Sequence, residues 1–212
     1  MSTSPAPQLD FGGLTVSYDD RVLRPRQWTT AQSYWAADLL RHAPAGPVLE
    51  LCAGVGHIGL LAVAGSSRPL VLVDFDETAC GFARVNAQRS AHEASIDVRQ
   101  GRVDEVVAPE ERFVGVLADP PWVPSAGTER FPDDPLTAID GGPDGMSIAW
   151  SCVDVAATHL VDRGWLLLQL GTQQQAEGVQ ERLDASPELA LKLLDVREYG
   201  ERGVLVHVVR SG

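Results

Sequence analysis

The four residues Asp119-Pro120-Pro121-Trp122 combine a carboxylate, a restricted backbone and an aromatic face. Each proline fixes its own φ near about −65°, lacks an N–H, and favours an extended conformation in the residue before it. The carbonyl acceptors of this segment therefore point in fixed directions. Such acceptors can hold the N–H bonds of a planar nitrogen and direct its lone pair toward an electrophile, while Trp122 stacks on the flat group. A Pro-Pro turn with a capping Asp119 and a buried Trp122 is the structural alternative.

The residues before this motif favour a binding site. The apolar run 113–118 predicts a buried strand that ends immediately before Asp119. In open α/β sheets, ligands bind at the carboxyl ends of the strands. The segment 119–122 is therefore expected at the ligand-binding edge of a sheet.

A second motif has the pattern of a nucleotide-type cofactor site. The apolar strand pattern of 48–51 is followed by Gly54, Gly56 and Gly59, which satisfy G-x-G-x-x-G at the start of an apolar helix. A second apolar run ends at Asp74, about 20 residues beyond the first glycine, where dinucleotide-binding folds have an acid that binds ribose. Tight packing between strand and helix, with no ligand, remains the alternative.

Glu50 distinguishes between two classes of cofactor. A charge at the end of a buried strand is costly unless it is paired, and a cationic amine on the ligand would pair with it. The pyrophosphate of a dinucleotide has no such amine, whereas the methionine part of S-adenosylmethionine has one. A nicotinamide oxidoreductase stays open as a rival, although Lys192 has Tyr199 only on its C-terminal side and not in the close pair typical of short-chain enzymes.

Together these motifs resemble class I S-adenosylmethionine-dependent methyltransferases, and specifically the protein-(glutamine-N5) methyltransferases that modify peptide-chain release factors. The resemblance covers about residues 20 to 210. The matching segments are 22–26, 50–56, 74, 86–87, 119–122 and 138–146. The resemblance implies an α/β protein with a three-layer Rossmann-like sandwich, whose sheet has seven mostly parallel strands, and methyl transfer to a planar nitrogen.

The resemblance also implies roles for individual residues. Residues expected to bind S-adenosylmethionine are Glu50, Cys52, Ala53, Gly54, Gly56, Asp74, Phe75, Arg102, Val103 and Asp119. Those expected at the catalytic corner are Asp119, Pro120, Pro121 and Trp122, with Trp122 and Asp140 binding the acceptor. Glu50 is expected to hold the amino group of the cofactor, and Asp74 its ribose hydroxyls.

Three features differ from the usual family pattern. Asp119 and Trp122 replace the usual Asn and Tyr, as in amino-methylating nucleic-acid enzymes and some small-molecule enzymes. Cys52 replaces the first glycine of the cofactor loop. About 45 residues precede the first strand of the resemblance, which is too few for the helical recognition domain of the release-factor enzymes.

Composition predicts one domain and a restricted class of acceptor. At 212 residues, with 44% hydrophobic residues, the chain is long enough for one core. Residues 20–212 are expected to form the single domain, and residues 1–19 a disordered or loosely ordered leader. The formal net charge of −12 opposes binding to a phosphate backbone, so a small molecule or a glutamine-like protein side chain is preferred to nucleic acid. The arginines at 21, 24 and 26 are expected on a solvated surface.

Strands and helices alternate along the chain, which predicts a parallel sheet with helices on both faces. Helices are expected at 29–41, 76–94, 147–160 and 175–184, and strands at 48–51, 71–74, 95–98, 113–118 and 164–170. Strands near 189–196 and 204–209 read as an antiparallel C-terminal hairpin. The irregular segment 123–145 is expected to be a loop on the substrate side.

The remaining signals concern the cellular setting. Three widely spaced cysteines at 52, 80 and 152 form no disulfide or metal pattern and suggest a reducing cytoplasm. No apolar run is long enough to span a membrane. No metal site is expected, and the sequence does not indicate the oligomeric state. The sequence thus predicts a cytoplasmic N-methyltransferase acting on a planar amide or amine. A non-catalytic scaffold that only binds the cofactor is a further rival.

Overall fold

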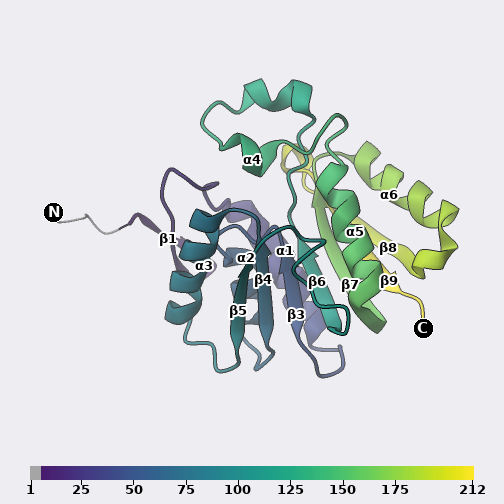
Figure 1. The fold of residues 1–212 in the computed structure, drawn as a ribbon, viewed down its shortest axis with the longest axis horizontal. Coiled ribbons are helices and arrows are strands. Elements are labelled where there is room, and N and C mark those ends of the chain that lie inside the picture. Colours follow the sequence, from purple (N-terminus) through teal and green to yellow (C-terminus); the bar gives the residue numbers. More distant parts are fainter. Residues whose placement is uncertain (1–5) are drawn as a thin grey trace.

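The computed structural model describes residues 6–212, and its centre is a seven-stranded sheet (Figure 1). The strand order is β5-β4-β3-β6-β7-β9-β8. The parallel strands are β3 (Val48–Leu51), β4 (Leu70–Asp74), β5 (Ile96–Gln100), β6 (Phe113–Ala118) and β7 (Leu160–Leu170). β8 (Leu191–Glu198) and β9 (Val204–Arg210) run antiparallel at one edge. The predicted seven-stranded, mostly parallel sheet with an antiparallel C-terminal hairpin is confirmed.

Helices cover both faces of the sheet, which gives the three predicted layers. α1 (Thr30–Leu40), α2 (His57–Val63) and α3 (Glu77–Arg89) pack on one face, and α5 (Ser147–His159) and α6 (Gln173–Ala185) pack on the other (Figure 1). Successive side chains of a strand point to opposite faces. In β4, Leu70 and Leu72 accordingly join the core under α1 to α3, while Val71 and Val73 join the core under α5 and α6. Burial on both faces explains why these strands read as continuous apolar runs.

The ends of two elements differ from the prediction. α3 ends at Arg89, five residues before the predicted end at residue 94, because Ala91 adopts a left-handed φ of 51°. β7 begins at Leu160, four residues before the predicted start, and its pairing with β6 shifts register between Phe113 and Gly115. Such an irregularity bends a strand locally, and a run of alternating residues does not reveal it in the sequence.

The predicted loose order of residues 1–19 is wrong for residues 8–17. β1 (Gln8–Phe11) and β2 (Leu14–Ser17) form a hairpin whose two-residue turn, Gly12-Gly13, has φ of 59° and 93°. Positive φ at both positions is the requirement of a tight hairpin turn, and glycine meets it without strain. The Asn86 side chain accepts a hydrogen bond from Ser17 N (2.8 Å) and donates one to Ser17 O (3.0 Å). Residues 1–5, also in the predicted leader, lie outside the described residues.

The segment 123–145 forms an arch above the carboxyl ends of the strands (Figure 1). It contains the 3-10 turn η2 (Ser125–Arg130) and the short helix α4 (Leu136–Ile139). Its two ends are joined by hydrogen bonds from Val123 N to Ile139 O (3.0 Å) and from Gly141 N to Val123 O (2.9 Å). The predicted loop is therefore a closed structural unit, which we call the arch.

Three further 3-10 turns are η1 (Gln27–Thr29), η3 (Pro187–Leu189) and η4 (Gly200–Arg202). η1 leads directly into α1, and η4 lies in the connection between β8 and β9. Within residues 6–212, no helix has the length and apolar character needed to cross a membrane.

Candidate functional site

A cavity of about 370 Å³ opens at the carboxyl ends of β3, β4 and β6. Its volume lies within the range of roughly 300 to 1,000 Å³ that is typical of small-ligand sites. The predicted site residues that line it are Cys52, Ala53, Gly54, Asp74, Phe75, Arg102, Val103, Asp119, Pro121 and Asp140. The structure thus brings ten residues of the two predicted motifs, and of the segments near them, to one cavity.

The turn after β3 forms one wall of the cavity. Cys52 and Gly54 both have left-handed φ, of 55° and 53°, and the turn is closed by a hydrogen bond from Gly56 N to Ala53 O (2.8 Å). A Cβ placed on Gly54 would meet no protein atom within 4 Å. The backbone at Gly54 is therefore open to close approach by a ligand, which is the usual reason for a glycine in a cofactor loop.

Asp74 connects this turn to the neighbouring strand β4. Its Oδ2 accepts a hydrogen bond from Gly54 N (2.6 Å), and its Oδ1 accepts one from Asp76 N (2.9 Å). Burial raises the pKa of the Asp74 carboxyl, and the backbone N–H groups of Asp76 and Gly54 oppose this rise. Each oxygen keeps a second lone pair, so the carboxylate can hold the turn and accept a ligand hydroxyl as well.

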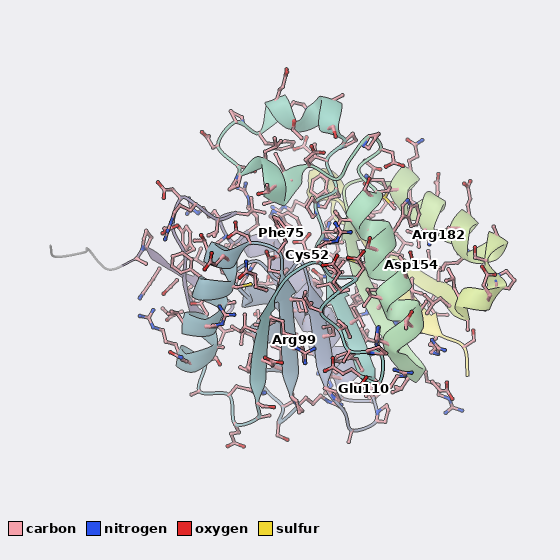
Figure 2. The ribbon with its side chains drawn as sticks, in the orientation of Figure 1. Cys52, Phe75, Arg99, Glu110, Asp154 and Arg182 are labelled. Carbon is pink, nitrogen blue, oxygen red and sulfur yellow. The ribbon has the colours of Figure 1, made fainter. Side chains whose placement is uncertain are left out.

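Phe75 places an aromatic ring at the rim of the cavity. It follows Asp74 at the end of β4 and is 67% exposed, which is unusual for a phenylalanine. Figure 2 shows Phe75 and Cys52 together above the carboxyl ends of the central strands. Val103 contributes a second apolar surface to the same cavity. A flat aromatic ligand group would remove the exposed ring from water.

The structure does not place Glu50 or Gly56 in the cavity wall. Glu50 is only 2% exposed, and its Oε2 accepts a hydrogen bond from Gly59 N in α2 (2.9 Å). The alternation of β3 directs this side chain toward α2, on the same side as Val48. Burial raises the pKa of the Glu50 carboxyl well above its ordinary value. This bond fastens β3 to α2, Gly56 packs against Leu72, and the contact of Glu50 with the amino group of the cofactor stays a prediction.

In the acceptor corner, residues 119–122, some residues also line the cavity and others do not. Asp119 and Pro121 line the cavity, whereas Pro120 and Trp122 do not. The Trp122 ring lies against Gly171 so closely that a Cβ on Gly171 would clash with it. In extended chain, residues two apart share a side, which explains why 119 and 121 face the cavity together. The Trp122 ring is therefore packed on Gly171, and its stacking on the acceptor stays a prediction.

Asp119 stands out among the acids of the cavity because its carboxylate makes no hydrogen bond or ion pair with any of residues 6–212. Burial raises its pKa to about 7. Asp140, by contrast, accepts hydrogen bonds from Ser125 Oγ (2.6 Å) and Gly142 N (2.9 Å), which lower its pKa. The two acids of the acceptor side therefore differ in what they can still bind.

Two buried glutamines that sequence reasoning missed hold the acceptor corner. Gln175 donates from Nε2 to Trp122 O (3.0 Å) and to Asp144 O (3.2 Å), while its Oε1 accepts from Gly171 N (2.9 Å). Gln32 donates from Nε2 to Ala118 O (3.1 Å) and Leu167 O (3.0 Å). The capping box at the start of α6, in which Gln175 pairs with Thr172, was a readable signal. Gln32 gave no signal, because its partners are distant in sequence.

The N-terminal segment completes the mouth of the cavity. The arginines at 21, 24 and 26 line it, so they are not merely part of a solvated surface. Arg26 makes two hydrogen bonds to the Asp134 carboxylate of the arch (2.6 and 2.7 Å). His57 also lines the cavity, with burial lowering its pKa to about 3, so it is neutral there.

Comparisons with known proteins agree with this geometry. Residues 33–131 match the family model of the methyltransferase small domain. The release factor glutamine methyltransferase of Geobacter sulfurreducens is 31% identical over 172 residues, which are 78% of this chain and 58% of the relative. Residues 33–131 are thus identified as a methyltransferase small domain. The ribosomal protein uL3 glutamine methyltransferase of Bradyrhizobium diazoefficiens is 27% identical, over 88% of the chain and 60% of the relative.

Solved structures show the same fold. The hMettl16 catalytic domain bound to an RNA hairpin has a TM-score of 0.72 at 16% identity, over 95% of this chain and 75% of that one. The magnesium protoporphyrin IX methyltransferase of Synechocystis with bound SAM has a TM-score of 0.61 at 13% identity, over 87% and 80%. At these identities the likeness concerns the fold alone. The chain spans about 60% of the length of the first two curated relatives.

S-adenosylmethionine is the cofactor that this family implies, and the cavity fits it in three respects. The backbone at Gly54 is open, the Asp74 carboxylate has lone pairs to spare, and Phe75 offers an uncovered ring. The open backbone at Gly54 allows the ligand to approach closely, Asp74 can accept from the ribose hydroxyls, and Phe75 can cover the adenine. The Asp119 and Asp74 carboxylates also suit a positively charged sulfur.

Proposed function

We propose that this protein is an S-adenosylmethionine-dependent N-methyltransferase acting on an amide or amine nitrogen of a protein side chain or a small molecule. The observation that carries the proposal is the shared cavity, which joins the Gly54 turn and Asp74 to Asp119 and Pro121. The family match and the curated relatives support methyl transfer rather than hydride transfer. The acceptor corner also argues against a scaffold that only binds the cofactor.

The cofactor half of the cavity has a binding role in this proposal. When bound, S-adenosylmethionine supplies an electrophilic methyl group on a sulfonium, so the protein needs to add little acid–base help. Asp74 accepts hydrogen bonds from the ribose hydroxyls, Gly54 lets the backbone approach the ligand, and Phe75 covers the adenine. Arg102 and Val103 border the same region.

The acceptor half has a positioning role. Asp119, which lines the cavity, accepts a hydrogen bond from the acceptor nitrogen and so directs its lone pair into the cavity, with Pro121 beside it as part of the wall. The arch and α5 line this side and exclude water from the reacting atoms. Asp140, already bonded to Ser125 and Gly142, shapes the arch beside the acceptor.

Glutamine side chains are one candidate acceptor, because the curated relatives are named for methylating glutamine in release factors and in ribosomal protein uL3. A cytoplasmic setting follows from the same proposal. Nucleic acid is disfavoured by the net charge of −12, although one structural neighbour is an RNA complex.

Isothermal titration calorimetry with S-adenosylmethionine and with NAD, on the unmodified protein, tests the choice of cofactor. We expect micromolar to submicromolar binding of S-adenosylmethionine and no binding of NAD. Incubation with isotopically labelled methyl donor and fractionated cell extract would then reveal the acceptor as a gain of one methyl group. Binding of NAD with no binding of S-adenosylmethionine would overturn the proposal.

A further inference from the structure

Residues 119–121 present hydrogen-bond acceptors to the cavity and no donor of their own. Asp119 lines the cavity with a carboxylate that no group of residues 6–212 bonds, and an ionised carboxylate only accepts. The next two residues, Pro120 and Pro121, have no backbone N–H. The buried amide of Gln32 donates from Nε2 to Ala118 O and Leu167 O, so its donor is already used. A group that docks at this corner must therefore bring the hydrogens.

The corner also lacks a positive charge. The arginines that line the cavity pair with other acids of the described chain: Arg21 with Asp19, Arg26 with Asp134, and Arg102 with Asp104. Arg24 has an exposed side chain at the mouth. A buried carboxylate without a cation is costly, and adding the missing cation relieves that cost.

The titratable groups near Asp119 supply no cation to it. Burial raises the pKa of the Glu50 carboxyl at the end of β3, the hydrogen bond with Cys152 and burial raise the pKa of the Cys52 thiol in the following turn, and the negative charge of Asp119 adds to both shifts. Asp74 at the end of β4 affects both groups in the same sense. Glu50 and Cys52 are therefore neutral, and His57 on α2 is neutral as well, so none of the three offers a charge to pair with Asp119. With S-adenosylhomocysteine, which has no sulfonium charge, in the cofactor half, a neutral ligand would leave the charge of Asp119 uncompensated.

From this geometry we propose that the acceptor is a basic amine that enters as an ammonium group, in preference to a carboxamide, and that Asp119 takes its proton. The inference rests on the proposed methyl transfer. An ammonium group offers only donors and a positive charge, which match the corner in both respects. A carboxamide is neutral, and its carbonyl oxygen lies beside its nitrogen, where it would face the Asp119 carboxylate.

The step balances in atoms and charge. The ammonium N–H proton moves to a carboxylate oxygen of Asp119, which frees the nitrogen lone pair. The nitrogen then bonds to the methyl carbon, and the carbon–sulfur bond breaks with its electron pair remaining on sulfur. The products are a methylated ammonium, a neutral thioether and a protonated Asp119. The proton leaves to water when the cavity opens.

Benzylamine and benzamide form a probe pair of similar size that tests the inference by binding alone. Each is titrated at pH 8 into protein saturated with S-adenosylhomocysteine, for the unmodified chain and for Asp119→Asn. We expect the amine to bind at least about tenfold more tightly than the amide in the unmodified chain, and no more than about twofold more tightly in Asp119→Asn. Equal binding of the probes, tighter binding of benzamide, undetectable binding of benzylamine, or an unchanged preference in Asp119→Asn would each overturn the inference.

Two controls separate this inference from the proposed function. Asp133→Asn makes the same change at an exposed acid of the arch and should keep the full preference for the amine. Titration of S-adenosylhomocysteine alone comes first. Failure at that stage overturns the proposed function, whereas normal cofactor binding without a preference for the amine overturns only the inference about the acceptor.

Discussion

The two halves of the cavity are built in different ways. The cofactor half comes largely from neighbouring turns of the chain, residues 52–56 and 74–76, joined by bonds such as Gly54 N to Asp74 Oδ2. The acceptor half joins segments far apart in sequence, through Arg26 with Asp134 and Gln175 with Trp122. Cofactor binding therefore depends on local geometry, whereas acceptor choice depends on long-range packing that can change without disturbing the cofactor half.

Asp119→Ala should cause the largest loss of turnover, and it should affect only the acceptor half of the cavity. Turnover is expected to fall by about 10²- to 10⁴-fold, because the acceptor loses its orienting and proton-accepting group. The dissociation constant of S-adenosylhomocysteine, which lacks the sulfonium charge that Asp119 faces, should stay within about twofold, since its other contacts lie in the cofactor half. Rates of methyl transfer and calorimetric titration measure the two quantities. A parallel loss of both would contradict the division of the cavity.

Asp74→Ala should show the opposite pattern. Cofactor affinity is expected to fall by about 10- to 100-fold, because the change removes a ribose partner and the anchor of Gly54 N. At saturating cofactor, turnover should recover to within a few-fold of the unmodified protein. Asp74→Asn keeps one acceptor oxygen and serves as the graded control, with an intermediate loss. Unrecovered turnover in Asp74→Ala would show that the halves are coupled.

Asp119→Asn should stabilise the fold in alkaline solution. Because the folded-state pKa of Asp119 is raised to about 7 from an ordinary value of 3.8, ionisation of this carboxyl costs the folded state free energy. Stability of the unmodified chain therefore falls as pH rises from about 4 to 7, and this loss then stays constant. The variant should be more stable by about 1 to 3 kcal/mol at pH 8, and no more stable at pH 4. Denaturant unfolding at both pH values checks the sign, and a gain at pH 4 alone would contradict it.

Gln175→Glu tests the long-range support of the acceptor half more gently. The new carboxylate still accepts from Gly171 N and Thr172 N, so the start of α6 is kept, but the bonds to Trp122 O and Asp144 O are lost. We expect kcat/KM for the acceptor to fall about tenfold, with unchanged cofactor affinity. Gln174→Glu, on the exposed side of the same helix, is the matched control and should change neither value. A loss of cofactor affinity in Gln175→Glu would rule out a role limited to the acceptor side.

The sequence was sufficient for the elements of the cofactor half. Strands 48–51 and 113–118 match β3 and β6 in every residue, and Asp74 lies at the end of β4 beside the glycine turn. These features follow from local rules, namely apolar runs, glycine turns and the fixed distance between a strand and the next turn. Most of the features of the cofactor half follow from residues that lie within about 20 positions of one another in the sequence.

The direction in which an individual side chain points was harder to predict from the sequence than the strands and turns of the cofactor half. Glu50 and Trp122 are next to cavity residues in the sequence but face away, because alternation along extended chain decides their direction. The hairpin at residues 8–17 depends on Asn86, and the corner depends on Gln32 and Gln175. Each of these partners lies tens of residues away, where a single sequence carries no signal of contact.

A crystal structure of the protein with S-adenosylmethionine tests the central claim most directly. The account predicts the adenine against Phe75, the ribose at Asp74, and the methyl carbon facing the open space beside Asp119 and Pro121. A donor bound elsewhere, or bound in this cavity with its methyl group turned away from Asp119, would contradict the account.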